Sequence, residues 1–320
     1  MPELPDVTVY VERLAELLVG RTLRRVRLKS PFLLRTVDPP LAAAEGRTMA
    51  SVRRVGKRIV LELRAPPADP ASSSAAEPLF LVLHLMIAGR LKWGAPGAGI
   101  PGKIGLAAFD VDDGTLLLTE ASGKKRASLH LLEGEAALAA HDRGGLEVME
   151  ASAAEFAAAL RRENHTLKRA LTDPRLLAGI GNAYSDEILH RARMSPFVQT
   201  GALTDEQLAA LLEATRAVLG EWTARLRDEA AAEVRAGHAL PRKVTAFRPG
   251  MAVHGRYGQP CPVCGAPVQR ILYAENEANY CAKCQTGGKL LADRVLSRLM
   301  KDDWPRTLEE LEERKREGRG

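Results

Sequence analysis

Apolar and polar positions follow different periods in successive parts of the chain. Near the start, apolar residues recur at close to the helical period, at Val7, Val9, Tyr10, Leu14, Leu17 and Leu18. Asp6 falls in the first turn of this segment and Gly20 follows the last, as at helix ends. Residues 22–130 instead contain short β-rich apolar runs, among them 58–63, 79–85 and 115–119. This spacing predicts a β-sandwich or barrel behind one N-terminal helix.

The pattern becomes helical beyond residue 151. Residues 151–237 are rich in Ala and Leu, and Pro and Gly residues divide them into several helices. We expect an amphipathic helix at 289–300 and a charged, frayed tail at 302–320. The sequence therefore predicts a multidomain α+β protein. Its expected parts are an N-terminal β-sandwich catalytic domain at 1–135, a helical domain at 150–240, a cysteine hairpin at 248–286 and an extra helical, charged tail at 287–320.

The amino-acid composition of the chain limits the kinds of molecule that it is expected to bind. No run of about 18 apolar residues occurs, which excludes a membrane-spanning helix. The N-terminus has neither a basic nor an apolar signal region, so we expect a cytoplasmic protein. Lys and Arg number 46 against 40 Asp and Glu, a net charge of +6. This excess favours an acidic partner, of which nucleic acid is the commonest.

The four cysteines form two tight pairs. Cys261 and Cys264 are followed, after sixteen residues, by Cys281 and Cys284. Each CxxC turn supplies two thiolates, and zinc requires four in a tetrahedron. We predict one structural Zn²⁺; redox pairs are the alternative. Because the protein supplies all four ligands, no open position remains for catalysis.

The chain start carries a second candidate chemistry. Pro2 follows Met1 directly, and a small second residue permits removal of the methionine, which would leave a secondary amine. An α-amine has a pKa of about 7.7–8.0, so part of it is neutral near pH 7. Such an amine can attack a sugar C1′ and form an iminium, with Glu3 as proton donor. Met-Pro-Glu openings are common, so these residues also fit a chain start without catalytic function.

Four segments, in the same order, resemble one known family. Residues 2–7 (Pro-Glu-Leu-Pro-Asp-Val) resemble the opening of the formamidopyrimidine-DNA glycosylase / endonuclease VIII (Fpg/Nei) family, which usually has Glu where Asp6 stands. Residues 53–58 resemble its lysine-bearing β-turn, 177–189 its helix–two-turn–helix and 253–261 its entry to the zinc finger. The resemblance implies a β-sandwich, a helix–two-turn–helix domain and a zinc hairpin that together bind double-stranded DNA.

The resemblance also implies a reaction and its residues. A damaged base would be flipped out of the duplex, the Pro2 nitrogen would displace it at C1′, and elimination would cut the strand. Glu3 would donate the proton, and Lys57 would hold a phosphate and assist β-elimination. Asn182 and Lys168 would contact backbone phosphates. Without the resemblance, Lys57 also fits a solvated turn lysine and Asn182 an ordinary turn asparagine. Lys168 likewise fits an exposed helix lysine.

The chain departs from the family at the zinc hairpin. Asn276 stands where family members carry an arginine that supports δ-elimination. In the family this arginine also clamps the phosphates of the flipped nucleotide, so the resemblance implies that Asn276 contacts DNA. Asparagine keeps the hydrogen bonding but lacks the charge and the bidentate fork of arginine. We therefore expect strand cleavage to stop mainly after β-elimination, unless the nearby Arg270 substitutes.

A second departure concerns the residues that fill the space left by the flipped base. Ile87 stands where the family often has Met, and Met86 precedes it; either side chain could be an apolar wedge or a core residue of a strand. Lys124, Lys125 and Arg126 replace an Arg–aromatic pair. These cations could neutralise phosphates or form a solvated loop. Oxidised purines and oxidised pyrimidines both remain possible lesions.

Two functions follow from these observations. The first is a monomeric base-excision repair glycosylase with AP-lyase activity, acting on DNA that contains a damaged base or abasic site near the nucleoid. The alternative is a non-enzymatic zinc-finger DNA-binding damage sensor. Pro2 and Glu3 discriminate between them. The seven histidines show no ligand-like spacing, and we expect His84 and His130 to be hydrogen-bonded structural residues.

Overall fold

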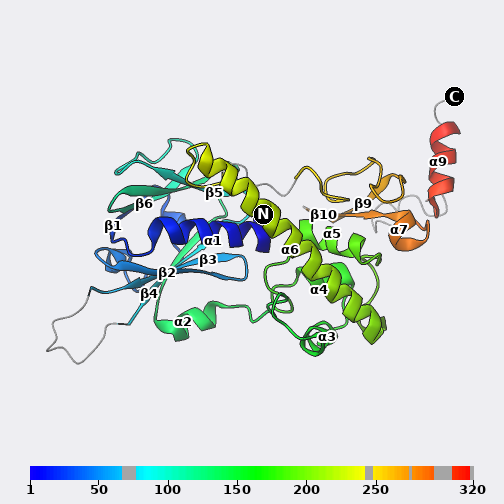
Figure 1. Cartoon of the computed structure of the whole chain (residues 1–320), viewed down its shortest axis with the longest axis horizontal. Coiled ribbons are helices and arrows are strands. Elements are labelled where there is room, and N and C mark those ends of the chain that lie inside the picture. The colour runs from blue at the N-terminus through cyan, green and yellow to red at the C-terminus, as the bar shows by residue number, and fades with distance from the viewer. Residues whose placement is uncertain (67–76, 242–247, 274–275, 292–304, 318–320) are drawn as a thin grey trace. The chain divides into compact units, whose positions relative to one another are not determined.

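A computed structural model describes residues 1–66, 77–241, 248–273, 276–291 and 305–317. The chain forms two compact units (Figure 1). The first contains Met1–Gly144 and Gly220–Thr245, and the second Gly145–Leu219 and Ala246–Gly320. In the described part of the chain, no helix is both long and apolar enough to cross a bilayer.

The first unit begins with the predicted helix α1, Leu4–Leu18, drawn in blue in Figure 1. A reciprocal capping box starts it, in which Glu3 N donates to Asp6 Oδ2 at 2.9 Å and the Glu3 carboxylate accepts the N–H of Asp6. Its apolar stripe, including Tyr10 and Leu14, is buried against strands β2, Thr48–Val55, and β3, Arg58–Arg64. The apolar residues that recur at the helical period in the sequence therefore form the face that the helix buries.

Two four-stranded antiparallel sheets form the predicted β-sandwich. One has the order β1-β6-β7-β5 and the other β2-β3-β4-β8. The first sheet comprises β1 Leu23–Leu28, β6 Gly105–Val111, β7 Gly114–Glu120 and β5 Gly89–Gly94. The second comprises β2 Thr48–Val55, β3 Arg58–Arg64, β4 Leu79–His84 and β8 Ser128–Glu133. One buried core joins them, with Leu61 and Leu83 from the second sheet and Phe109 and Leu116 from the first.

The other face of the second sheet carries helix α2, Gly134–His141. Val60, Phe80 and Val82 alternate with the core-facing residues of β3 and β4, and they pack with Leu138 of α2. Because successive strand residues point to opposite faces, this sheet is apolar on both sides.

Helix α6, Asp205–Arg235, supplies residues to both units. Its portion beyond Gly220 belongs to the first unit, where Leu226 and Ala230 pack on Val9 of α1. Arg227 adds an ion pair with Glu12, at 2.6 Å between Nη2 and Oε1.

The second unit holds the helical part and the cysteine hairpin. Its helices are α3 Ala153–Arg161, α4 Leu167–Thr172, α5 Asn182–Arg191 and the first half of α6. Strands β9 Val268–Tyr273 and β10 Asn276–Cys281 form the hairpin, and α7, Ala282–Thr286, follows it. The fold predicted from sequence is confirmed in both units.

The tail contains helix α9, Leu308–Glu317, within the segment 287–320 for which a helical, charged tail is predicted. The fraying expected for 302–320 is wrong for this helix. Backbone pairing anchors the start of this helix: Leu290 N donates to Arg306 O at 2.9 Å and Leu308 N to Gly288 O at 3.1 Å. Leu308 is buried with Ile271 of the hairpin. Most of the helix predicted at 289–300 lies outside the described residues.

Candidate functional site

Four charged side chains lie in electrostatic range of the α-amino group at the chain start and shift its pKa. Burial lowers the pKa of the Met1 α-amino group; Glu3 and Asp6 raise it, and Arg90 and Lys57 lower it further. Pro2 is buried in the chain that retains Met1, and Glu3 is only 2% exposed. The amino terminus therefore lies in a shielded environment with carboxylates and cations in electrostatic range, which favours a neutral amine.

Lys57 lies in the tight turn between β2 and β3. Val55 pairs with Arg58 across the ladder, so Gly56 and Lys57 form a two-residue hairpin turn. Gly56 has a φ of +56°, in the left-handed region, and Arg54 Nη1 donates to its carbonyl at 2.7 Å. The predicted lysine is thus held at the tip of a braced turn on the chain-start side of the first unit.

Met86 and Ile87 occupy the turn between β4 and β5. Ile87 is 56% exposed, so it is not the core residue that was the alternative interpretation of the sequence. Gly89 N donates to Leu85 O at 2.8 Å, and a Cβ at Gly89 would come within 2.3 Å of that same oxygen. The close chain approach therefore requires glycine, and it presents Ile87 at the tip of the turn.

A buried carboxylate organises the loop that carries Lys124, Lys125 and Arg126. Glu120, at the end of β7, is 1% exposed. Its carboxylate accepts the N–H groups of Arg126 and Ala127 at 3.0 Å each and the Ser122 hydroxyl at 2.9 Å. Lys125 Nζ also donates to the Glu120 carbonyl. The sequence analysis did not single out Glu120. Its only sequence signal is that it is the one acid just before the three cations.

The structure brings Lys168 and Asn182 together in the second unit. Lys168 Nζ donates to the Asn182 carbonyl at 2.7 Å and to Ser185 Oγ at 2.8 Å. The Asn182 side chain donates from Nδ2 to Glu277 O of the hairpin at 2.8 Å. Lys168 is 8% exposed, so it is a buried lysine and not an exposed helix lysine. The partners of its ammonium in this structure are protein groups.

Two acids of α5 connect that helix to the segment before the cysteines. Asp186 Oδ1 accepts from Lys168 Nζ at 2.5 Å, and its Oδ2 lies 2.7 Å from His254 Nδ1. Glu187 accepts the backbone N–H groups of residues 252, 253 and 254 at 2.7–2.9 Å. Burial raises the pKa of Glu187 although these three bonds oppose the shift. Sequence reasoning missed both acids and His254.

The cysteine side chains satisfy the geometry of one zinc ion. All four Sγ atoms lie within 4.8 Å of one another, and none forms a disulfide. Burial raises the pKa of Cys281 to about 11 and also raises that of Cys284. Cys281 and Cys284 therefore resist ionisation without a cation, so metal binding would release their protons. Cys261, Cys264, Cys281 and Cys284 would hold the ion, which would brace the hairpin.

His190, near the end of α5, reaches this cluster. Its Nε2 lies 3.3 Å from Cys261 Sγ. Burial, followed by the charges of Arg191 and Arg193, lowers the pKa of His190. The ring is therefore neutral near pH 7 and can donate one N–H to a thiolate.

Asn276 and Arg270, the two residues on which δ-elimination is expected to depend, lie at different positions of the hairpin. Asn276 opens β10 and pairs with Tyr273, whereas Arg270 pairs with Asn279. The Arg270 guanidinium lies 4.3 Å from the ring centroid of Tyr257, and its Nη1 is 3.8 Å from Glu277 Oε2. Arg270 is therefore engaged within the hairpin.

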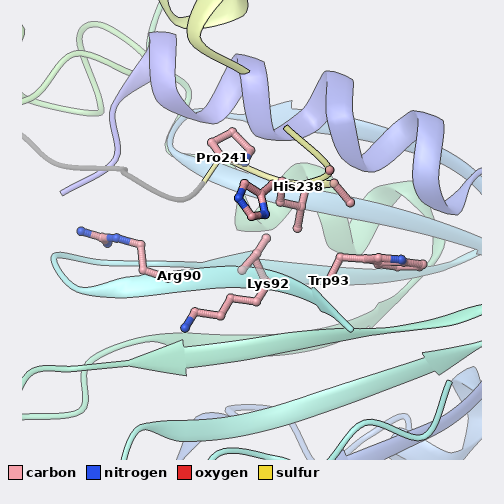
Figure 2. A pocket seen from close by; sticks show the side chains of 9 residues that line it. Arg90, Lys92, Trp93, His238 and Pro241 are labelled. Carbon is pink, nitrogen blue, oxygen red and sulfur yellow. The ribbon is translucent and has the colours of Figure 1, made fainter. Parts of the chain in front are cut away.

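A cavity of about 490 Å³ lies in the first unit. Figure 2 shows Arg90, Lys92 and Trp93 on β5, with His238 and Pro241 facing them from the segment after α6. The wall combines cations with apolar surface. Arg90 also lowers the pKa of the Met1 amine, so this wall of the cavity lies in electrostatic range of the chain start.

Comparison with known proteins accounts for these features together. Residues 1–122 match the formamidopyrimidine-DNA glycosylase N-terminal domain and 146–228 the H2TH domain of the same glycosylase. Residues 258–287 match the zinc finger found in FPG and IleRS. The formamidopyrimidine-DNA glycosylase of Chloroflexus aggregans is 32% identical over 289 residues, which cover 89% of this chain and 98% of that protein. The chain belongs to the formamidopyrimidine-DNA glycosylase family.

Solved structures of this family agree with the fold. The crystal structure of the MutM (Fpg) protein from Thermus thermophilus is 31% identical, has a TM-score of 0.67, and covers 89% of this chain and 98% of its own. The Lactococcus lactis Fpg, in a complex with DNA containing an abasic site, has a TM-score of 0.73 at 21% identity, covering 89% and 99% of the two chains. The second comparison supports the fold alone.

Proposed function

We propose that this chain is a DNA glycosylase of base excision repair that also cleaves abasic sites through its N-terminal proline. Family membership carries the glycosylase assignment, because the full-length relatives are named formamidopyrimidine-DNA glycosylases. The observation that supports the proline chemistry is the burial of Pro2 and Glu3 at a chain start where the amine of the unprocessed chain, on Met1, is shielded and lies in electrostatic range of Lys57 and Arg90.

The proposed reaction begins after Met1 is removed. The neutral Pro2 nitrogen attacks C1′ of the damaged nucleotide, the C1′–N bond breaks, and the base leaves with a proton from Glu3. Glu3, now a carboxylate, takes the proton from the Pro2 nitrogen and donates it to O4′ as the C1′–O4′ bond breaks; the sugar ring opens, and an iminium forms between Pro2 and C1′. Loss of a C2′ proton then expels the 3′-phosphate by β-elimination, and water releases the enzyme. Lys57 neutralises the phosphate that leaves.

The proposed substrate is double-stranded DNA containing a damaged base or an abasic site, bound by a monomer at the nucleoid. Ile87, exposed at its turn, would enter the space left by the extruded base, with Met86 supporting the turn. Lys124, Lys125 and Arg126 would contact phosphates from the loop that Glu120 organises. Asn182 and Lys168 would do so from the helix–two-turn–helix.

The products follow from the residue at position 276. Asparagine cannot supply the charged fork that an arginine offers to phosphates, and Arg270 is engaged with Tyr257 and Glu277. We therefore expect 3′ ends of the β-elimination type. A gel that resolves the 3′ ends tests this, and a dominant 3′-phosphate product contradicts it.

Base release and strand nicking, measured separately on a panel of duplexes with oxidised purines or pyrimidines, test the proposed function. The processed protein should release a base from at least one lesion, and Glu3→Gln should slow release by more than about tenfold. Arg24→Gln is the matched control, since Arg24 is exposed on β1 and pairs with Asp112. Tight binding to the lesions without release of any base favours the damage-sensor alternative.

A further inference from the structure

Three imidazoles gather at the end of α2, on the outer face of the second sheet. Arg58 pairs with His84 across β3 and β4, and Val82 pairs with His130 across β4 and β8. This register places Arg58, His84 and His130 on one face of the sheet. His141, the last residue of α2, stacks on His130 with ring centroids 4.4 Å apart and a tilt of 57°.

The environment holds these rings neutral. Burial lowers the pKa of His84 to about 4, and Arg58 and Lys57 lower it further. Burial also lowers the pKa of His130 to about 4, with His141 and Arg58 as the next causes. We expect His84 and His130 from the sequence to be hydrogen-bonded structural residues. The structure shows in addition that both belong to a cluster of imidazoles with several cations nearby.

Two more cations face the cluster from other elements. Arg35, in the segment before β2, lowers the pKa of His130. Arg143, just after α2, faces both His141 and Arg58. The carboxylate that faces Arg58 is Asp142, and its effect is smaller than those of burial and Arg143, so the pKa of Arg58 is lowered.

Among the described residues, Asp142 offsets this positive charge only in part. Among those residues, no carboxylate forms an ion pair with Arg35, Arg58 or Arg143. His141 Nε2 is buried and has no hydrogen-bond partner. A buried polar atom without a partner is uncommon and calls for a ligand or a function. The cluster thus combines an excess of positive charge with an unused hydrogen-bonding atom.

We propose that Arg58, His130, His141 and Arg143 form a binding site for a phosphate group, and that the imidazole pair takes up a proton from solvent when the phosphate binds. The anion would offset the repulsion between the guanidinium groups and an imidazolium ring. A protonated His141, whose ring is only partly buried, could then donate to a phosphate oxygen. Binding and protonation stabilise each other, so affinity should rise as pH falls.

The source of the phosphate group that we favour is the DNA backbone. Lys57, the proposed phosphate contact, directly precedes Arg58 in the chain, so a strand held at Lys57 passes near this cluster. This assignment rests on the proposed function. Free phosphate has the same chemistry, and the experiment separates the two sources.

Calorimetric titration with duplex DNA that carries a non-cleavable abasic analogue measures the proton uptake. Titrations at about pH 6 in two buffers of different ionisation enthalpy give the number of protons bound with the DNA. We expect His141→Gln to lower that number and to weaken binding about threefold to tenfold at about pH 6, with less effect at about pH 8. Arg143→Gln should reduce the salt slope by about 1, whereas Arg24→Gln should leave both quantities unchanged.

Imidazole resonances followed by NMR identify the source. If inorganic phosphate alone raises the pKa values of His130 and His141, the site accepts free phosphate as well as DNA. If only the duplex raises them, the backbone is the ligand. No rise with either ligand, together with unchanged proton uptake in His141→Gln, overturns the proposal. Because the analogue cannot react, failure of the Pro2 chemistry leaves this result intact, and a response to phosphate without DNA binding counts against the proposed function alone.

Discussion

The ammonium of Lys168 lies 2.5 Å from the carboxylate of Asp186, and both side chains are buried. The same carboxylate reaches His254, and the same ammonium reaches the Asn182 carbonyl. One buried ion pair thus connects α4, the turn of the helix–two-turn–helix and the segment before the cysteines. Lys168 stabilises the element that is expected to carry the DNA contact of Asn182.

Removing Lys168 should therefore destabilise the second unit. Lys168→Ala leaves a buried carboxylate with less compensation, a change that typically costs about 3–5 kcal/mol. Urea unfolding followed by circular dichroism measures the loss. Arg169→Ala, at the exposed next position of α4, is the matched control. Equal unfolding free energies for the two variants would show that the ion pair is not structural.

The loop with Lys124, Lys125 and Arg126 should depend on Glu120. In Glu120→Ala, the N–H groups of Arg126 and Ala127 lose their acceptor, and each lost bond to a charged group is worth about 1.5–3 kcal/mol. Hydrogen exchange at these two amides should accelerate by at least about tenfold. Glu133→Ala, at an exposed position, should change nothing in the loop. Unchanged protection in Glu120→Ala would mean that the loop is ordered by other contacts.

The histidine cluster gives a pH dependence of stability with a defined sign. His84 and His130 have folded pKa values of about 4, below the unfolded value of about 6.5. Between these values the unfolded chain binds more protons, so stability is complete above about pH 6.5 and falls as pH approaches about 4. Solvent screening reduces the loss to roughly 1–2 kcal/mol for His130.

His130→Gln isolates this contribution from other titrating groups. Glu187, whose folded pKa is raised, loses stabilising protonation as pH rises, so it acts in the opposite direction. The difference in unfolding free energy between wild type and His130→Gln, measured at about pH 7.5 and about pH 4.5, removes its effect. A difference that does not change with pH contradicts the assigned burial of His130.

His190 should slow zinc loss from the four cysteines. Its Nε2–H can donate to the Cys261 thiolate, and partners in the outer shell of metal sites typically contribute about tenfold or more in affinity. His190→Ala should release zinc faster to a chromophoric chelator, by about tenfold. Glu213→Ala, at an exposed position of α6 in the same unit, is the control. Equal release rates in the two variants would exclude the contact as a stabilising one.

The sequence predicted the features that depend on local spacing. The apolar period from Val7 to Leu18 and the acid at Asp6 were enough for α1, and two CxxC pairs were enough for a zinc site. The missing features depend on contacts distant in sequence. Asp186 and His254 are separated by 68 positions, and His130 meets His141 only because α2 folds back on the sheet. Glu120 looked like one more charged loop residue because its partners are backbone N–H groups, which no sequence pattern displays.

Borohydride trapping on an abasic-site duplex tests the central claim most directly. Mass spectrometry should first establish that the protein begins at Pro2, and a preparation whose α-amine has been acetylated serves as the control. A reduced covalent adduct should form on the Pro2 peptide of the processed protein, and almost none should form in the control. Equal trapping in both preparations, or an adduct that maps to a lysine such as Lys57, would contradict it.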